Sequence, residues 1–143
     1  MTPRAISLAS LLTYSGTLPL IACAVHLAAA LAWLNAPTLA LCYASVILSF
    51  LAGIHWAVFL FGAQPCPQNL LIRSNAVALL AWASLLISPQ LMAFALQAVL
   101  FLYLLLLDQS LHRAGAMPTW FFTLRCRATA IVVCCLLVIG VLA

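Results

Sequence analysis

The sequence predicts an all-α integral membrane protein, a bundle of five transmembrane helices that forms a single domain over residues 1–143. Composition is the first observation: 69% of the residues are hydrophobic and 4% are charged, whereas a soluble domain has about 25% charged residues. The second is length, because the apolar runs hold about 20 residues each, enough to cross a hydrocarbon core of about 30 Å. The connections between these runs are too short for a second domain.

The expected helices differ mainly in how they are joined. The first contains Gly16 and Pro19 and should bend there, because proline removes a backbone hydrogen bond. Two prolines in segment 64–69 predict a stiff loop, and Pro89 predicts a tight bend. The longest polar stretch, 108–119, connects the last two helices. We expect helices over residues 6–34, 38–63, 70–88, 90–109 and 120–142.

The arginines predict the orientation of the bundle. The chain has five arginines and no lysine, and with five helices every arginine falls on one side of the membrane. Because positive residues favour the cytoplasmic side, we expect a cytoplasmic amino terminus and a carboxyl terminus outside. These scattered arginines form no phosphate-tracking surface, so the expected surroundings are the lipid bilayer and no nucleic acid is expected. They are Arg4, Arg73, Arg113, Arg125 and Arg127.

Small residues recur every fourth position of the second expected helix, at Ser45, Ser49, Gly53 and Ala57. Residues four apart share one face of a helix, and a smooth face of this kind lets another helix backbone pack closely. We therefore predict a helix-packing strip, with a hydroxyl-lined path as the alternative.

His55, followed by Trp56, lies inside the same apolar helix. An ionisable side chain at membrane depth is costly and marks a candidate functional site. Three roles are open: a neutral hydrogen-bonded structural role, contact with haem or a quinone with Trp56 as a wall, and proton transfer. We predict no cofactor for this protein. If it binds one, haem or a quinone is the group that His55 and Trp56 could bind.

A metal site is not expected. His26 and His55 differ in depth by more than about 10 Å on a rise of 1.5 Å per residue, and His112 falls at the membrane interface. The six cysteines include no C-x-x-C pair, and cysteine in an apolar helix usually behaves as a small hydrophobic residue.

Asp108 is the only acidic residue, and we expect it at the cytoplasmic end of the fourth helix. We predict a charge-assisted pair with Arg125 that holds the last connection in place. The alternative is an aspartate that faces water, with the arginines extended toward lipid headgroups. Pro118 and Trp120 are expected to form an interfacial anchor, since aromatic residues settle at the headgroup boundary.

Several of these residues resemble a known family. The stretch 43–57, YASVILSFLAGIHWA, is similar to the helix-two signature of the transmembrane protein 69-like family, a family of unknown function from bacteria and mitochondria. Weaker matches are Gly16-Thr17-Leu18-Pro19, Ala81-Trp82 with Pro89, and the series Asp108, Gly115, Pro118, Trp120 and Leu124-Arg125. Departures are Ala52 and Ala57 in place of glycine and Phe121 in place of tyrosine. The resemblance implies a small polytopic protein of the bacterial inner membrane, with the mitochondrial inner membrane as the alternative, and implies no reaction.

Three functions remain open at this point. The first is an accessory or assembly partner of a larger membrane complex, for example a respiratory one, or a self-associating protein. The second is a haem- or quinone-binding protein that uses His55. The third is a small proton-coupled transporter or channel, with His55 as relay and Asp108 at its mouth. The sequence shows no nucleophile–base pair and no pair of catalytic carboxylates, so we do not expect an enzyme.

Overall fold

The computed structural model describes residues 2–31, 33–62 and 69–143, and within these ranges it contains helices and no strand. Five helical spans are long and apolar enough to cross a membrane, with α1 and α2 counted together as one span. The predicted fold class is confirmed, and the protein is a multi-pass membrane protein. The elements are α1 (Pro3–Ser15), α2 (Leu18–Ala28), α3 (Ala36–Phe61), α4 (Asn69–Ala83), the short 3₁₀ helix η1 (Ser84–Leu86), α5 (Gln90–Arg113) and α6 (Thr119–Leu142).

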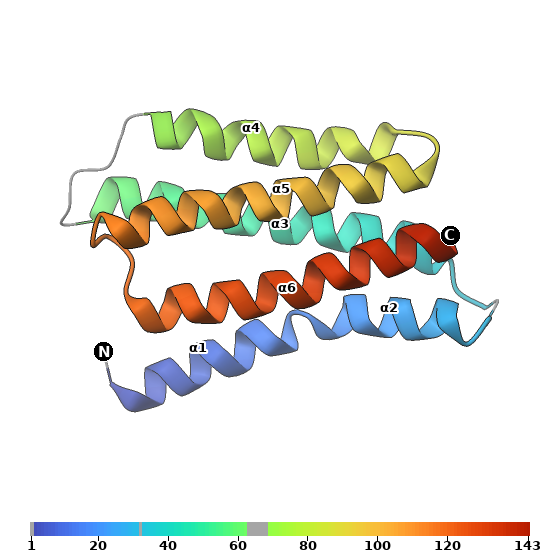
Figure 1. Cartoon of the computed structure of the whole chain (residues 1–143), viewed down its shortest axis with the longest axis horizontal. Helices are drawn as coiled ribbons and strands as arrows, with labels where there is room; N and C mark the ends of the chain where they lie inside the picture. Colours follow the sequence, from blue (N-terminus) through green and yellow to red (C-terminus); the bar gives the residue numbers. More distant parts are fainter. Residues whose placement is uncertain (1, 32, 63–68) are drawn as a thin grey trace.

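Three helices, α3, α5 and α6, form the centre of the bundle (Figure 1). The helix α4 packs along α3 and α5, and α2 packs against α6 and α3 on the other side. The start of α4, the end of α5 and the start of α6 lie at the end of the bundle where the chain begins, and the carboxyl terminus lies toward the opposite end (Figure 1). The arginines therefore gather toward one end, as the predicted orientation requires. Which side of the membrane this end faces stays a prediction.

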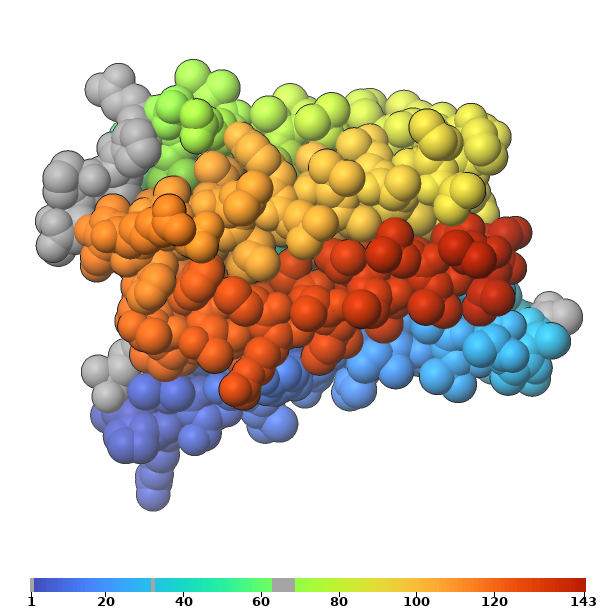
Figure 2. All heavy atoms as spheres, viewed as in Figure 1, coloured from blue at the N-terminus to red at the C-terminus, as the bar shows by residue number. Residues whose placement is uncertain are grey.

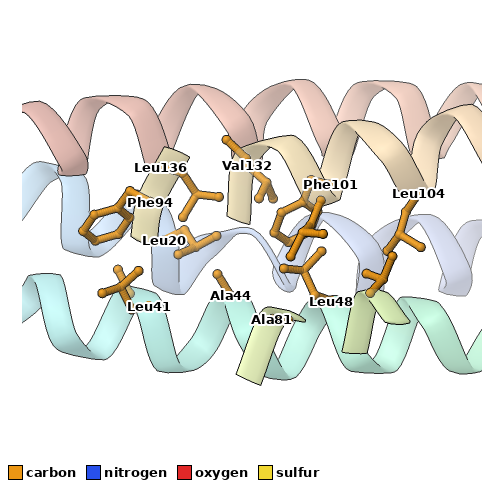
Figure 3. Close-up of a cluster of buried hydrophobic side chains, with 14 of the residues drawn as sticks. Leu20, Leu41, Ala44, Leu48, Ala81, Phe94, Phe101, Leu104, Val132 and Leu136 are labelled. Carbon is orange, nitrogen blue, oxygen red and sulfur yellow. The ribbon is translucent and has the colours of Figure 1, made fainter. Parts of the chain in front are cut away.

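The core is a continuous set of aliphatic and aromatic side chains (Figure 3). Leu41, Ala44 and Leu48 of α3 face Phe94 and Phe101 of α5 across the centre of the bundle. Leucine and valine side chains from α2 and α6 close the same space. Because lipid tails are as apolar as these side chains, the helices are held by close packing and by polar contacts, not by exclusion of water.

The first span is interrupted at the bend that Gly16 and Pro19 predict, so the expected helix over 6–34 consists of two helices joined there. The helix α1 ends at Ser15 and α2 begins at Leu18. Pro19 has no N–H to donate to the carbonyl four residues before it. The hydroxyl of Tyr43 on α3 donates to the Gly16 carbonyl at 2.8 Å, so the break becomes a contact between helices.

The end of the first span is also earlier than expected. The helix α2 stops at Ala28 because Ala30 adopts a left-handed backbone with φ 51°. The N–H of Ala30 donates to the Leu27 carbonyl at 2.9 Å, and the N–H of Leu31 donates to the His26 carbonyl at 3.2 Å. These two bonds form a Schellman motif, a common helix end.

The remaining boundaries follow caps and prolines. Asn35 caps α3, its side-chain oxygen accepting the N–H of Thr38 at 3.3 Å, so α3 begins slightly earlier than expected. Residues 63–68 lie outside the described ranges, and so do the end of the expected 38–63 helix and most of the expected 64–69 loop. The helix α5 continues to Arg113 where an end near 109 was expected. As a result His112 lies in a helix and not in the connecting loop.

Candidate functional site: a buried histidine, aspartate and arginine

Three ionisable side chains from three helices meet inside the bundle. His55 lies on α3, Asp108 on α5 and Arg125 on α6, each five or six residues from the end of its helix. The ends of α3 and α5 and the start of α6 all lie at the same end of the bundle (Figure 1). Each residue is therefore about one and a half turns, or roughly 9 Å, from that end.

The aspartate joins the other two side chains. Nε2 of His55 lies 2.8 Å from Oδ1 of Asp108, and Nε of Arg125 donates to Oδ2 of the same carboxylate at 2.8 Å. Asp108 thus contacts Arg125, the partner expected from the sequence, and it also contacts His55. The side chains of His55 and Asp108 are 1% and 2% exposed, so the alternative of an Asp108 that faces water is wrong.

The charges within this cluster balance. A buried carboxylate is costly unless it is paired and hydrogen-bonded, and here the guanidinium of Arg125 neutralises it at short range. Nδ1 of His55 is buried and has no hydrogen-bond partner among the described residues. The neutral tautomer with its hydrogen on Nε2 fits this arrangement, because a protonated ring would leave a buried N–H without an acceptor. The cluster is then neutral as a whole.

The cluster can hold three helices in one register. Removing one partner of a buried ion pair leaves an uncompensated charge, at a cost of about 3–5 kcal/mol. Nε2 of His55 already binds Asp108, so Nδ1 is the ring atom that has no hydrogen-bond partner among the described residues. Within residues 2–31, 33–62 and 69–143, no group of three or more histidine, cysteine or acidic side chains could hold a metal ion.

His55 and Trp56 do not share a site. The His55 side chain points into the bundle, whereas Trp56 is 38% exposed on the outside of α3. The indole N–H of Trp56 donates to the side-chain oxygen of Asn75 on α4 at 3.3 Å. The expected cofactor site with Trp56 as a wall of a His55 pocket is therefore not formed by these two side chains.

The small-residue strip of α3 lies mostly on the surface. Ser45 is buried, but Ser49, Gly53 and Ala57 are exposed. A Cβ added at Gly53 would meet no atom within 4 Å. Within the described part of the chain, the strip from Ser49 to Ala57 is thus left uncovered, and a packing partner for it would have to come from elsewhere.

The α5–α6 connection is held by local contacts. Pro118 is the residue before α6, and the half-buried Trp120 lies edge-on to Phe121 with ring centroids 5.5 Å apart. His112 places Nδ1 3.0 Å from the Met117 carbonyl and stacks on an aromatic ring of α6. The role of Pro118 and Trp120 as an interfacial anchor stays a prediction.

Two buried features of the bundle were not predicted from the sequence. The contact between His55 and Asp108 could have been found from depth, because both residues lie five or six positions before the end of helices that run in the same direction. The other is Gln97, a fully buried amide on α5. Its Nε2 donates to the Leu41 carbonyl at 3.1 Å and to the Ser84 hydroxyl at 2.8 Å. An uncharged amide inside an apolar run gives a weaker signal than a charge.

Fold and cluster together define the class: a small multi-pass membrane protein whose central helices are joined by a buried charged cluster. Residues 5–141 match the family described as protein of unknown function (DUF3429), and the chain belongs to that family. Comparisons with curated proteins and with solved structures gave no match. The narrower resemblance to the transmembrane protein 69-like family remains a prediction.

Proposed function

We propose that this membrane protein is an accessory or assembly partner of a larger complex in the bacterial inner membrane, with a respiratory complex as the first case to test. The observation that carries the proposal is the uncovered strip of Ser49, Gly53 and Ala57 on α3. In a bilayer, small residues on a helix face allow close approach of a second helix backbone. The proposed occupant is a transmembrane helix of another protein.

The neighbourhood of the strip supports a helix as the occupant. The strip keeps a four-residue spacing over two turns of α3, so its small residues form a smooth row, slightly inclined to the helix axis, on which another helix can pack. Large exposed side chains, including Phe50 and Leu60, lie on the same helix outside the strip. A crossing helix would contact both the smooth strip and these side chains, which is the geometry of small-residue packing in membranes.

The cluster of His55, Asp108 and Arg125 has a supporting part in this proposal. It fixes α3 relative to α5 and α6 through short contacts to one carboxylate. A docking helix gains affinity when its surface is already rigid, because less conformational freedom is lost on binding. The buried cluster therefore serves the exposed strip by holding α3 in place.

The test is native mass spectrometry of the protein gently extracted from its own membranes. We expect it to migrate with other subunits, and Gly53→Leu to lower the co-extracted subunits at least about tenfold. Leucine is a better helix former than glycine by up to about 1 kcal/mol, so this change should not unfold α3. A free monomer in the unchanged protein would contradict the proposal, and so would a mass showing only copies of this chain.

A matched control makes the same kind of change at another exposed position. Ala22 lies exposed on α2 and is not part of the strip. Ala22→Leu should leave the complex intact. If Ala22→Leu releases the partner as fully as Gly53→Leu does, then the effect comes from added bulk in the membrane and the strip is not the docking surface.

A further inference from the structure

A pocket of about 120 Å³ lies where the α1–α2 break meets α3 and α6. Its inner walls are apolar and include Leu51, Phe101 and Val132. Phe50 and Leu12 also line it, and both side chains are more than half exposed on the outside of the bundle. The pocket therefore reaches the surface that the spans present to lipid, and α1 and α6 border one another on the face drawn in Figure 2.

The size of the pocket suits a single ring. An engineered apolar protein cavity of about 150 Å³ takes up benzene and stays free of water. A bound ring would fill the pocket, and its substituents and tail would extend along the exposed side chains of α1 and α3. An occupant that arrives from the bilayer must itself be soluble in lipid.

Two polar side chains on α6 line the pocket one turn apart, Arg125 and Thr129. The Thr129 side chain is buried, with the residue 2% exposed, and its hydroxyl has no hydrogen-bond partner among the described residues. Arg125 uses Nε for Asp108, and within residues 2–31, 33–62 and 69–143 no acceptor is found for its terminal nitrogens. Residues four apart on a helix face the same way, so both side chains border the same side of the pocket.

The other hydroxyls of the pocket are already used. Thr13 donates to the Ala9 carbonyl at 2.8 Å, and Thr17 donates to the Tyr14 carbonyl at 2.8 Å. Both lie in the α1–α2 span. The donors that remain for an occupant are therefore those of Arg125 and Thr129, and an oxygen acceptor between them would satisfy a buried hydroxyl that has no partner among the described residues.

The balance of charge favours a neutral acceptor. Among the described residues that line the pocket, Arg125 alone is charged, and the carboxylate of Asp108 already compensates it at 2.8 Å. A bound anion would add a negative charge to a cluster that is already neutral, at the high cost of a buried unpaired charge. A carbonyl oxygen accepts the same hydrogen bonds without this cost.

We propose that this pocket binds the head of a lipid-soluble ligand, a neutral ring with a carbonyl oxygen such as a quinone. The carbonyl accepts hydrogen bonds from the Arg125 guanidinium and the Thr129 hydroxyl, and the ring packs between Phe101 and the aliphatic walls. His55 does not line the pocket and contributes only by holding Asp108 against Arg125. The inference goes beyond the proposed partner role and concerns binding alone, without electron transfer.

The test uses the purified full chain in detergent, titrated with decylubiquinone, dodecane and palmitate and followed by isothermal titration calorimetry. We expect decylubiquinone to bind at least about tenfold more tightly than either other probe. Equal binding of dodecane would mean an apolar cleft without carbonyl recognition and would overturn the proposal. Tighter binding of palmitate would overturn it in favour of an anion, and no binding of any probe would overturn it as well, because the pocket would then take up no lipid-soluble ligand.

Two variants test whether decylubiquinone binds in this pocket. Thr129→Val keeps the shape and removes the hydroxyl, and it should raise the Kd for decylubiquinone about two- to tenfold, the effect of one lost hydrogen bond. Ala128→Leu adds bulk at a buried wall of the pocket and should raise the Kd at least about tenfold. The matched Ala130→Leu, at an exposed position of α6, should leave it unchanged.

Folding of each variant is checked by its circular dichroism and its thermal midpoint. If Ala128→Leu does not fold, Thr129→Val still decides the matter, since a Kd equal to that of the unchanged protein would overturn the proposal. Because the experiment uses the isolated chain, its failure leaves the docking proposal intact, and loss of the larger complex leaves the pocket intact.

Discussion

The two ends of the α3–α5 interface are joined by different chemistry. Near the start of both helices, Gln97 donates to the Leu41 carbonyl and to the Ser84 hydroxyl, and no charge is involved. Near their other end, Asp108 accepts hydrogen bonds from His55 and Arg125. Both sets of side chains are buried. The two sets differ in whether the remaining side chains still have hydrogen-bond partners after one side chain is removed.

The neutral contact uses acceptors that have other partners. The Ser84 hydroxyl donates to the Ala81 carbonyl at 2.7 Å regardless of Gln97, and a carbonyl such as that of Leu41 has two lone pairs. The charged cluster has no such reserve, because Arg125 without Asp108 would be a buried cation without an anion. Loss of one member of the neutral contact should therefore lower the stability of the bundle by a small amount. Loss of one member of the charged cluster should lower it far more, because all three helices are joined through the same carboxylate.

The largest effect is expected from Arg125→Met, which leaves the Asp108 carboxylate unpaired. The free energy of unfolding should fall by about 3–5 kcal/mol, measured by equilibrium unfolding in mixed micelles. Arg127→Met is the matched control, since Arg127 lies exposed on the same helix, and it should cost less than about 1 kcal/mol. Equal losses of stability in the two variants would contradict the stabilising role of the buried pair of Arg125 and Asp108.

A second variant sharpens the same prediction. Adding Asp108→Asn to Arg125→Met removes the unpaired charge, so the double variant should be more stable than Arg125→Met alone. A further fall in stability would mean that the carboxylate was stabilised by His55 without help from the arginine.

A smaller effect is expected at the neutral end. Gln97→Met keeps the length of the side chain and removes two hydrogen bonds, at a cost of about 1–3 kcal/mol. The measurement is the same unfolding equilibrium. Gln109→Met is the control, because Gln109 lies on the same helix and is only half-buried. If Gln97→Met lowered the free energy of unfolding more than Arg125→Met does, the neutral end would stabilise the bundle more than the charged end, contrary to this prediction.

The smallest effect is expected from Tyr43→Phe, which removes the hydroxyl that binds the Gly16 carbonyl. One neutral hydrogen bond contributes about 0.5–1.5 kcal/mol. Tyr103→Phe, at an exposed position of α5, should change the thermal midpoint less. If the Tyr43 and Tyr103 variants behave alike, the contact at the α1–α2 break does not contribute to stability.

Much of this structure follows from local sequence. Five apolar runs predict five spans because the length of a run matches the thickness of the bilayer, and the structure contains five such spans. Pro19 marks the break in the first span. The end of α2 was not predictable in the same way, because Ala30 takes a left-handed backbone that usually requires glycine.

The sequence by itself determined the class of the protein and one contact of its cluster. A single acidic residue in a chain with few charges needs a partner, and Arg125 was the expected one among the arginines at that end of the bundle. Only the tertiary structure decided that His55 joins them, that Trp56 turns away, and that Gly53 is left uncovered. The physical reason is that hydropathy fixes the depth of a residue in the membrane, while packing of the helices fixes the direction in which its side chain points.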